Sequence, residues 1–267
     1  MINTIILIIS LSTLGATGLA LYKIWKIHLL SFELMEKTRV THTETQHLFS
    51  QIQSYIDLRD LLKMNHPLPT LRGWAASPDF LLLIARHVLE KAPKSVVECS
   101  SGATTVVLAR CMQMNGKGHV YSFEHDPEFA LKTRSHLSFC NLSEWATVID
   151  APLQQLDDMP DQIWYSTDQI DRFQDIDMLV IDGPPWDTCK CARYPSIPML
   201  KDRFSPNCSI FLDDAARDDE KWMVKKWVEE HDNLTSEYML LEKGAVKIDS
   251  VLCRSHSHQQ VAEMKNV

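Results

Sequence analysis

The pattern of apolar and polar residues divides the chain into an uncharged N-terminal segment, a helical stretch and a region of alternating strands and helices. Residues 1–22 carry no charged side chain, and the run from Ile5 to Ile9 is entirely apolar. About twenty such residues in a helix, at roughly 1.5 Å each, span the roughly 30 Å hydrocarbon core of a bilayer. The pattern therefore predicts a transmembrane anchor over residues 1–24.

Positive charges lie only on the C-terminal side of this segment, at Lys23, Lys26 and Arg39. The positive-inside rule then predicts a single-pass membrane protein whose C-terminal bulk faces the cytoplasm. A secretory signal peptide is a competing interpretation, because small residues between Ala16 and Ala20 offer a cleavage site. A signal peptide, however, normally carries Lys or Arg before its apolar core. A buried core helix is a third interpretation, although such a helix is rarely uncharged over this length.

Residues 25–70 are predicted to form a helical juxtamembrane linker. Apolar residues recur there at spacings of three and four, at Leu48, Ile52, Tyr55, Leu58 and Leu62. An amphipathic helix that packs on the following domain explains this pattern. A short coiled coil that makes a homodimer stays open as an alternative. The prolines of the His66–Pro69 stretch then end the helix.

Strands alternate with helices in the rest of the chain. The predicted helices are 77–91, 103–114, 127–139 and 218–231, and the predicted strands are 95–98, 119–124, 146–150, 178–182, 209–213, 237–241 and 245–251. This alternation indicates an α/β fold, a doubly wound, seven-stranded, mostly parallel sheet with helices on both faces. The last two strands are close enough to form a closing hairpin. We assign residues 71–253 to this domain and 254–267 to a polar tail, with Ser77 expected to cap the first helix.

Composition excludes some classes of function. The 267 residues include 27 Lys and Arg against 35 Asp and Glu, a formal net charge of −8. No basic stripe is present, so we expect no nucleic-acid partner. Seven cysteines are scattered without a C-x-x-C pair. This usage is typical of a reduced, cytosolic protein rather than of a disulfide framework.

The ends of the first two predicted strands suggest a cofactor that carries a nucleoside. The first strand runs into the small-residue turn 98–102, which opens a helix with free N–H groups. The second strand ends at Glu124, where a carboxylate can accept hydrogen bonds from both ribose hydroxyls. The turn lacks the G-x-G-x-x-G of a dinucleotide site, because Ser100 and Thr104 stand beside Gly102. A ligand without a diphosphate, such as S-adenosylmethionine, fits better, and Glu98 is placed to orient its amino-acid moiety.

With these motifs the chain resembles the class I S-adenosylmethionine-dependent methyltransferases from roughly Ser77 to Leu252. The resemblance implies a Rossmann-like fold and a methyltransferase activity. The residues that it assigns to the cofactor are Glu98, Ser100, Gly102, Thr104, Glu124, Asp150, Ala151 and Asp182. Asp150 and Ala151 follow the third strand and, by the same resemblance, lie near the adenine. The usual motif has two or three glycines, so Ser100 and Thr104 depart from it.

Carboxylates also follow the fourth and fifth predicted strands, at Asp182, Asp213 and Asp214. We expect these three to converge, where they would repel each other unless a proton or a cation neutralises them. Hard oxygen ligands suit Mg²⁺ or Mn²⁺. The arrangement resembles the metal site of catechol O-methyltransferase-like enzymes, and a metal there would lower the pKa of an acceptor hydroxyl. We therefore predict a metal site at all three and catalytic roles for Asp182 and Asp214. A helix cap and a closed turn are the structural alternative.

A narrower resemblance concerns the acceptor. Asp182-Gly183-Pro184, Arg193-Tyr194-Pro195 and the run 213–217 with Glu220 are similar to plant glucuronoxylan O-methyltransferases and to bacterial methyltransferases associated with surface polysaccharide. This implies a hydroxyl of a sugar or glycan precursor as acceptor, although a small-molecule acceptor stays open. The predicted substrate contacts are Arg193, Arg217 and Trp186.

Alternatives stay open for these substrate contacts and for the function. The two arginines can hold an acceptor carboxylate or phosphate, or can pair with the acidic residues instead. A membrane-tethered, non-catalytic scaffold and a nicotinamide-dependent oxidoreductase remain rival functions.

Overall fold

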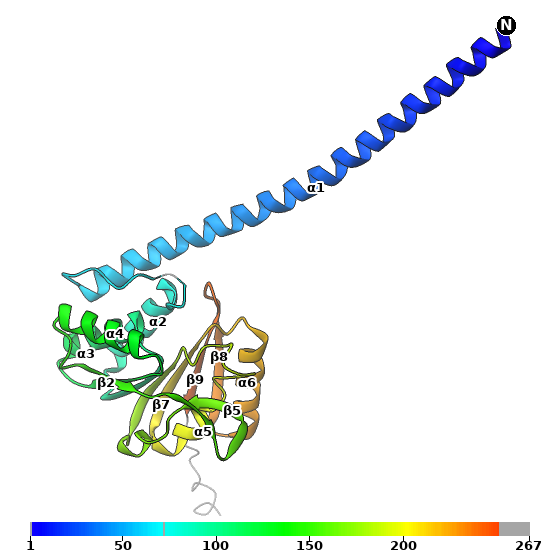
Figure 1. Cartoon of the computed structure of the whole chain (residues 1–267). Coiled ribbons are helices and arrows are strands. Elements are labelled where there is room, and N and C mark those ends of the chain that lie inside the picture. The colour runs from blue at the N-terminus through cyan, green and yellow to red at the C-terminus, as the bar shows by residue number, and fades with distance from the viewer. Residues whose placement is uncertain (1, 72, 251–267) are drawn as a thin grey trace, which may run out of the picture. The chain divides into compact units, whose positions relative to one another are not determined.

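The computed structural model of this protein describes residues 2–71 and 73–250 (Figure 1). The chain forms two compact units that divide between Ser50 and Gln51. The first unit is helical and belongs to α1 (Ile2–Leu62), which is one continuous helix. The part of α1 from Ile2 to Arg39 is long and apolar enough to cross a membrane, and a signal sequence has the same properties. The predicted tail 254–267 lies outside the described residues.

The second unit is built on one seven-stranded sheet. Its strands are β1 (Ser95–Cys99), β2 (His119–Glu124), β3 (Ala146–Asp150), β6 (Ile176–Ile181), β7 (Phe204–Asp213), β8 (Leu234–Met239) and β9 (Ala245–Ser250). Their order across the sheet is β3-β2-β1-β6-β7-β9-β8. Only β9 runs antiparallel to its neighbours, β7 and β8, among the described pairs. The predicted doubly wound fold with its closing hairpin is therefore confirmed.

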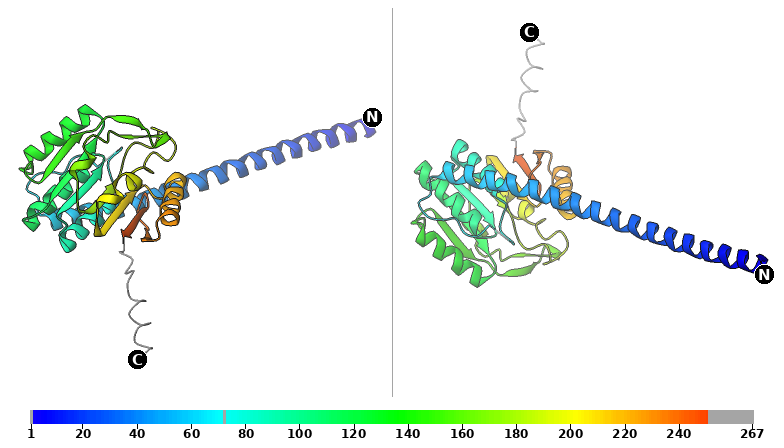
Figure 2. Two further views of the ribbon diagram at one scale, coloured as in Figure 1. Left: turned by 90° about the horizontal axis from the view of Figure 1, so that it is seen from below. Right: turned by 90° about the horizontal axis from the view of Figure 1, so that it is seen from above.

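Helices cover both faces of this sheet. They are α2 (Pro78–Lys91), α3 (Ala103–Asn115), α4 (Pro127–Phe139), α5 (Ser196–Leu200) and α6 (Asp218–Glu230). Alternate strand residues point to opposite faces, so Val96 packs in the core with α2, α3 and α4, whereas Val97 packs in the core with α5 and α6. Figures 1 and 2 show α3 and α4 beside β2 and β3, and α6 beside β8.

The sequence analysis missed several elements. The stretch 152–175 contains an antiparallel hairpin of β4 (Leu153–Leu156) and β5 (Met159–Tyr165), followed by a 3₁₀ turn at Ile170–Arg172. Polar residues along the hairpin hide its strand character, although Trp164 and Tyr165 at its end are fully buried. The five-residue α5 and the 3₁₀ turn Lys201–Arg203 after it are too short to leave a periodic pattern.

Asp79 joins three segments of the second unit. Its Oδ2 accepts hydrogen bonds from Gln51 Nε2, near the end of α1, and from the backbone N–H of Glu242, in the β8–β9 connection, both at 2.8 Å. Its Oδ1 accepts from the Ser77 hydroxyl at 2.5 Å. Ser77 therefore precedes α2 as predicted, but its side chain bonds Asp79 instead of capping the helix backbone.

We expect Asp79→Ala to lower the free energy of unfolding by about 3 kcal/mol, because it removes several hydrogen bonds to a charged acceptor. Urea denaturation of the full-length chain in detergent micelles, followed by tryptophan fluorescence, measures this change. Asp60→Ala, at an exposed position on α1, is the matched control and should stay within about 0.5 kcal/mol of the wild type. Equal stability of the two variants would contradict the role of Asp79.

Candidate functional site

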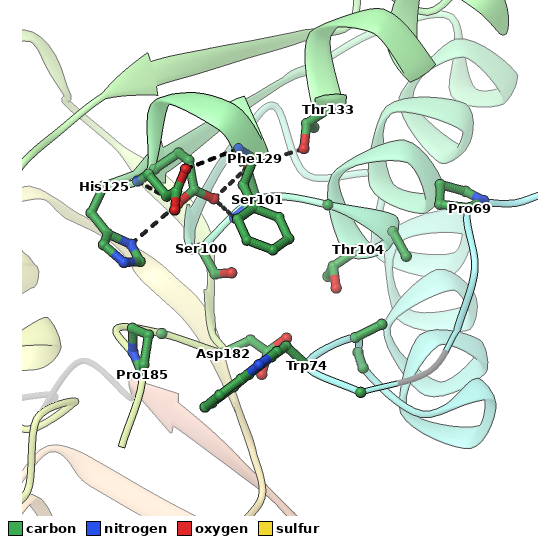
Figure 3. Close-up of a pocket in the computed structure, with 18 of the residues that line it drawn as sticks. Pro69, Trp74, Ser100, Ser101, Thr104, His125, Phe129, Thr133, Asp182 and Pro185 are labelled. Carbon is green, nitrogen blue, oxygen red and sulfur yellow. Dashed lines mark hydrogen bonds and ion pairs between the residues drawn. The ribbon is translucent and has the colours of Figure 1, made fainter. Parts of the chain in front are cut away.

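A cavity of about 590 Å³ opens where β1, β2 and β6 end (Figure 3). Its walls come from the β1–α3 turn, α4, the loop after β6 and residues 69–70 and 73–76, which precede α2. The carboxyl ends of strands are the expected ligand side of a doubly wound sheet. The predicted site residues are therefore expected to line this cavity.

The β1–α3 turn brings three predicted residues, Ser100, Gly102 and Thr104, to the cavity. Gly102 precedes α3 with a φ of +147°, which residues with a side chain rarely adopt. Ser100 has a φ of +112° although it is not glycine. Backbone strain of this kind costs on the order of 1–3 kcal/mol and collects at functional sites. The serine that departs from the glycine motif thus keeps the backbone path that a glycine would follow.

Glu98 lies beneath this turn and does not line the cavity. Its side chain is fully buried, and its Oε2 accepts hydrogen bonds from Thr105 Oγ1 at 2.7 Å and from Ser122 Oγ. Burial raises the pKa of Glu98 to about 8, despite the opposing effect of these two hydroxyls. Thr105 in turn accepts the N–H of Gly102 at 3.0 Å. The structure therefore shows Glu98 supporting the turn from below rather than contacting the cavity.

Glu124 does line the cavity, at the end of β2. Its carboxylate accepts from Ser101 Oγ at 2.7 Å, from the N–H groups of Ser101 and Asp126 at 3.1 and 3.0 Å, and lies 3.2 Å from His125 Nδ1 (Figure 3). Burial by itself would raise the pKa of Glu124, but these donors outweigh it and hold the pKa below its usual value. Glu124 is thus an ionised, fixed acceptor, as the ribose role requires.

Three predicted residues lie away from the cavity. Asp150 is exposed and pairs with Arg134 at 2.8 Å. Ala151 is buried, and its N–H donates to the Glu124 carbonyl at 2.7 Å. Trp186 is 58% exposed and does not line the cavity, whereas its neighbour Pro185 does. The structure does not bring these three side chains to the space that the other residues share.

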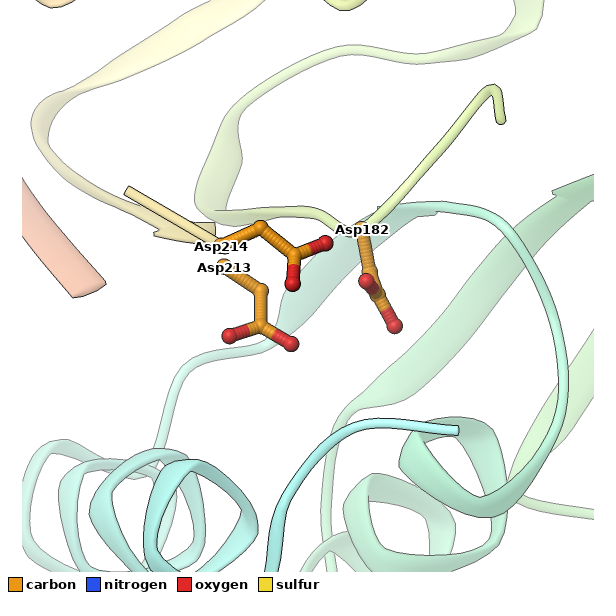
Figure 4. Close-up of side chains that lie close together, drawn as sticks. All are labelled: Asp182, Asp213 and Asp214. Atoms are coloured by element: carbon orange, nitrogen blue, oxygen red, sulfur yellow. The ribbon is translucent and has the colours of Figure 1, made fainter. Parts of the chain in front are cut away.

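Asp182, Asp213 and Asp214 converge as predicted, and we call them the acidic cluster (Figure 4). One carboxylate oxygen of each lies within 4.8 Å of the others. Asp182 and Asp214 line the cavity, whereas Asp213 is buried and neither of its oxygens has a hydrogen-bond partner among the described residues. Burial and the Asp213 charge raise the pKa of Asp182 well above its usual value, and burial with Asp214 raises that of Asp213 to about 6. The side chains do not cap α6, which starts after Arg217.

Arg193 and Arg217 both reach the cavity and both pair with the acidic cluster. Arg193 Nη2 lies 2.9 Å from Asp214 Oδ2, and Arg217 Nη1 lies 3.0 Å from the same oxygen. Arg193 is only 4% exposed, whereas Arg217 is 41% exposed. Of the two roles left open for these residues, ion pairing is the one visible in the structure. Only Arg217 also presents a solvent-accessible guanidinium.

Several lining residues were missed from the sequence. Trp74 belongs to the segment before α2, is 65% exposed and lines the cavity, as does Phe129 on α4 (Figure 3). Lys243, in the β8–β9 connection, also lines the cavity. Two sequence signals could have identified such residues. Trp74 is a single tryptophan in a connection without periodicity, and Phe129 lies in the first helical turn after Glu124.

A family model described as a methyltransferase domain matches residues 97–215. The matched stretch runs from β1 to the residue after Asp214, so it contains Glu98, Glu124 and the whole acidic cluster. No curated protein matches the sequence significantly.

Solved methyltransferase structures share the fold. An O-methyltransferase from Bacillus cereus in complex with SAH has a TM-score of 0.53 and 16% identity over 75% of this chain and 90% of that chain. An SAH-bound methyltransferase from Podospora anserina has a TM-score of 0.53 and 11% identity over 73% of this chain and 86% of that one. An O-methyltransferase from Streptomyces achromogenes, involved in tomaymycin synthesis and in complex with SAM, has a TM-score of 0.50 and 12% identity over 75% of this chain and 88% of that chain. The likeness at these identities is one of fold, the Rossmann-like methyltransferase fold.

The buried Glu98 carboxyl predicts a pH dependence of stability. Between its usual pKa of 4.5 and its folded pKa of about 8, the folded chain holds a proton that the unfolded chain has lost. Stability therefore falls as pH rises through this window, by at most about 1.4 kcal/mol per pH unit. Glu98→Gln cannot titrate, so its free energy of unfolding should decline less between pH 5 and 8.

Chemical denaturation of the full-length chain in detergent at several pH values measures the effect. Glu144→Gln changes an exposed carboxyl and serves as the control, whose pH profile should follow the wild type. Parallel profiles for the wild type and Glu98→Gln would show that Glu98 is ionised in the folded protein.

Proposed function

We propose that this chain is an S-adenosylmethionine-dependent methyltransferase, which its domain match and its fold support, and that it methylates a hydroxyl oxygen of a sugar or glycan precursor. One observation carries the site assignment: Glu124, the β1–α3 turn and Asp182 line a single cavity. The ribose-binding acid and a carboxylate for the acceptor therefore face the same space. That arrangement suits transfer between a bound nucleoside cofactor and a second substrate.

The cofactor side of the cavity offers groups suited to the ribose, the carboxylate and the adenine of S-adenosylmethionine. Glu124 offers ionised oxygens to the ribose hydroxyls. Ala103 and Thr104, in the first turn of α3, line the cavity, and the free N–H groups of a helix N-terminus favour the carboxylate of the methionine moiety. Phe129 presents an apolar ring for the adenine. When bound, the cofactor supplies an electrophilic methyl group on a sulfonium.

Asp182 is the group that we propose to take up the proton that the acceptor hydroxyl loses. Its carboxylate lines the cavity. In its ionised form, the raised pKa makes it a stronger proton acceptor than an ordinary aspartate. Asp214 lies beside it and is held by Arg193 and Arg217. Positioning and electrostatics supply the catalysis, because direct transfer needs no covalent intermediate with the enzyme.

A divalent cation fits the donor set of the acidic cluster but not its surroundings. Carboxylate oxygens suit Mg²⁺ or Mn²⁺, and the oxygens of Asp213, which have no hydrogen-bond partner among the described residues, are available as ligands. Asp214 Oδ2, however, already contacts Arg193 and Arg217, and Lys243 Nζ lies 4.0 Å from its Oδ1. The proposed reaction therefore uses no metal, in contrast to the expectation from the sequence.

The acceptor and the location rest on the sequence. The resemblance to polysaccharide-associated methyltransferases supports a sugar hydroxyl, and the exposed guanidinium of Arg217 suits an acceptor with a carboxylate or phosphate. Trp74 offers an exposed ring in the same cavity as Asp182 for stacking on a sugar face. We propose that α1 anchors the chain and that the catalytic domain faces the cytoplasm, where lipid-linked glycan precursors are accessible.

The cofactor assignment predicts that the full-length chain in detergent binds S-adenosylmethionine with a Kd on the order of micromolar. Glu124→Ala should weaken binding by about 1.5–3 kcal/mol, because it removes hydrogen bonds to a charged group. Isothermal titration calorimetry measures both values, with Glu144→Ala as a control that should bind like the wild type. Circular dichroism checks that each variant is folded. A folded wild type that binds no cofactor would instead support the non-catalytic scaffold.

The acceptor chemistry predicts that Asp182→Asn loses methyl transfer by about 100-fold or more. The assay measures transfer of a radiolabelled methyl group to sugars and lipid-linked glycans, with S-adenosylmethionine affinity measured in parallel. The matched control is Asp187→Asn, an exposed aspartate of the same loop. Near-normal transfer by Asp182→Asn would remove Asp182 from the mechanism.

A further inference from the structure

We infer that Arg193 is the resident cation of the acidic cluster, that it positions Asp182 and Asp214, and that the enzyme works without a divalent metal. From the sequence, Arg193 was predicted to contact the substrate, and a metal ion was predicted to bind the three carboxylates. This inference deepens the proposed function. It depends on that function only where it gives the acidic cluster a part in methyl transfer.

The Arg193 guanidinium ties together the ends of two neighbouring strands. Its Nη1 donates to the Asp213 carbonyl, at the end of β7, at 3.0 Å. Its Nη2 donates to the carbonyl of Asp182, directly after β6, at 2.9 Å. These carbonyls precede or belong to the residues that face the cavity. The guanidinium therefore fixes the spacing of the two backbone segments that carry the acidic cluster.

The same guanidinium holds the carboxylates. Nη2 lies 2.9 Å from Asp214 Oδ2 and 3.6 Å from Asp182 Oδ1, and Nη1 lies 3.8 Å from Glu220 Oε1. Arg193 is almost entirely excluded from water, so these interactions are weakly screened. A charge this deeply buried is retained only where it is paired, and removal of one partner leaves the other uncompensated.

The formal charges leave little need for a second cation. Four acids, the acidic cluster and Glu220, face three cations, Arg193, Arg217 and Lys243. A single proton balances that set, whereas a divalent ion would make it positive. Mg²⁺ also requires oxygens at about 2.0–2.1 Å in near-octahedral geometry. The side of Asp214 Oδ2 toward Asp182 is already occupied by the guanidinium.

The local backbone holds Arg193 in this place. It lies in the turn before α5, where the Cys191 N–H donates to Asp219 Oδ2 at 3.2 Å and the Ser196 N–H donates to the Arg193 carbonyl at 3.2 Å. The next residue, Tyr194, stacks on the buried Trp227, whose Nε1 donates to the Tyr194 carbonyl at 3.0 Å. The guanidinium is thus delivered from a fixed segment, as expected for a positioning residue.

One chemical consequence separates Arg193 from a metal. A metal ion can take the acceptor oxygen as a ligand and lower its pKa directly. A guanidinium can only donate hydrogen bonds and cannot take an oxygen as a ligand, and Nη2 of Arg193 already donates to the Asp182 carbonyl and to Asp214 Oδ2. Activation of the acceptor then falls to the carboxylates that Arg193 orients.

Calorimetric titration of the full-length chain in detergent with Mn²⁺ alone tests the inference. The wild type should show no stoichiometric binding. Arg193→Met removes the cation and leaves the acidic cluster with uncompensated negative charge. This variant should therefore gain Mn²⁺ binding, and Mn²⁺ should raise the Tm of the variant by several degrees. Arg203→Met, whose arginine pairs with Asp171 outside the cavity, is the control and should gain neither. A purely structural arginine would lower Tm without creating a metal site.

Arg193→Lys is a second variant, which keeps the inference testable if Arg193→Met does not fold. It keeps the charge but replaces the planar guanidinium fork with a single ammonium group, so it cannot reproduce the geometry of these contacts. It should therefore fold with a lower Tm and still bind no Mn²⁺. One Mn²⁺ per wild-type chain, lost on Asp182→Asn, would overturn the inference. Because no cofactor or acceptor is present in these titrations, their result is independent of whether the proposed methyl transfer is correct.

Discussion

Parallel pairing of β1, β2, β6 and β7 is the constraint on which the site depends. Strands that run in the same direction end at the same edge, so the residues that follow them meet although they are far apart in the sequence. The β1–α3 turn, Glu124 and Asp182 reach one cavity for this reason. The price of that convergence is electrostatic, because the same edge collects carboxylates. The buried guanidinium of Arg193 offsets their repulsion where solvent cannot.

Two acids on adjacent strands show how the surroundings separate their roles. Glu98 on β1 is sealed beneath the turn and keeps its proton at neutral pH, so it supports Thr105 and Ser122 as a neutral partner. Glu124 on β2 faces the cavity and receives enough donors to stay ionised despite partial burial. Burial and donor count, rather than residue type, decide which of them presents charge to a ligand.

Most of the sheet was predictable, because each buried strand is a short apolar run bounded by turn residues, and β2, β3 and α4 begin and end where expected. The strand-end acids were predictable from topology. The β4–β5 hairpin was not, since its polar pattern resembles a loop. Trp74 reaches the cavity from a connection without periodicity. Pairing of Arg193 with the acidic cluster was one of two alternatives that the sequence left open, because a sequence does not show which charges a turn residue will face.

The last turns of α1 matter for how the domain can be separated from the N-terminal part of this helix. Leu58 and Leu62 are fully buried in the core with α2 and α3, and Gln51 bonds Asp79. A fragment that starts at the helix break near residue 66 would expose this core and loosen the segment that walls the cavity. A fragment that starts at Gln51 keeps these contacts, because the second compact unit begins at that residue.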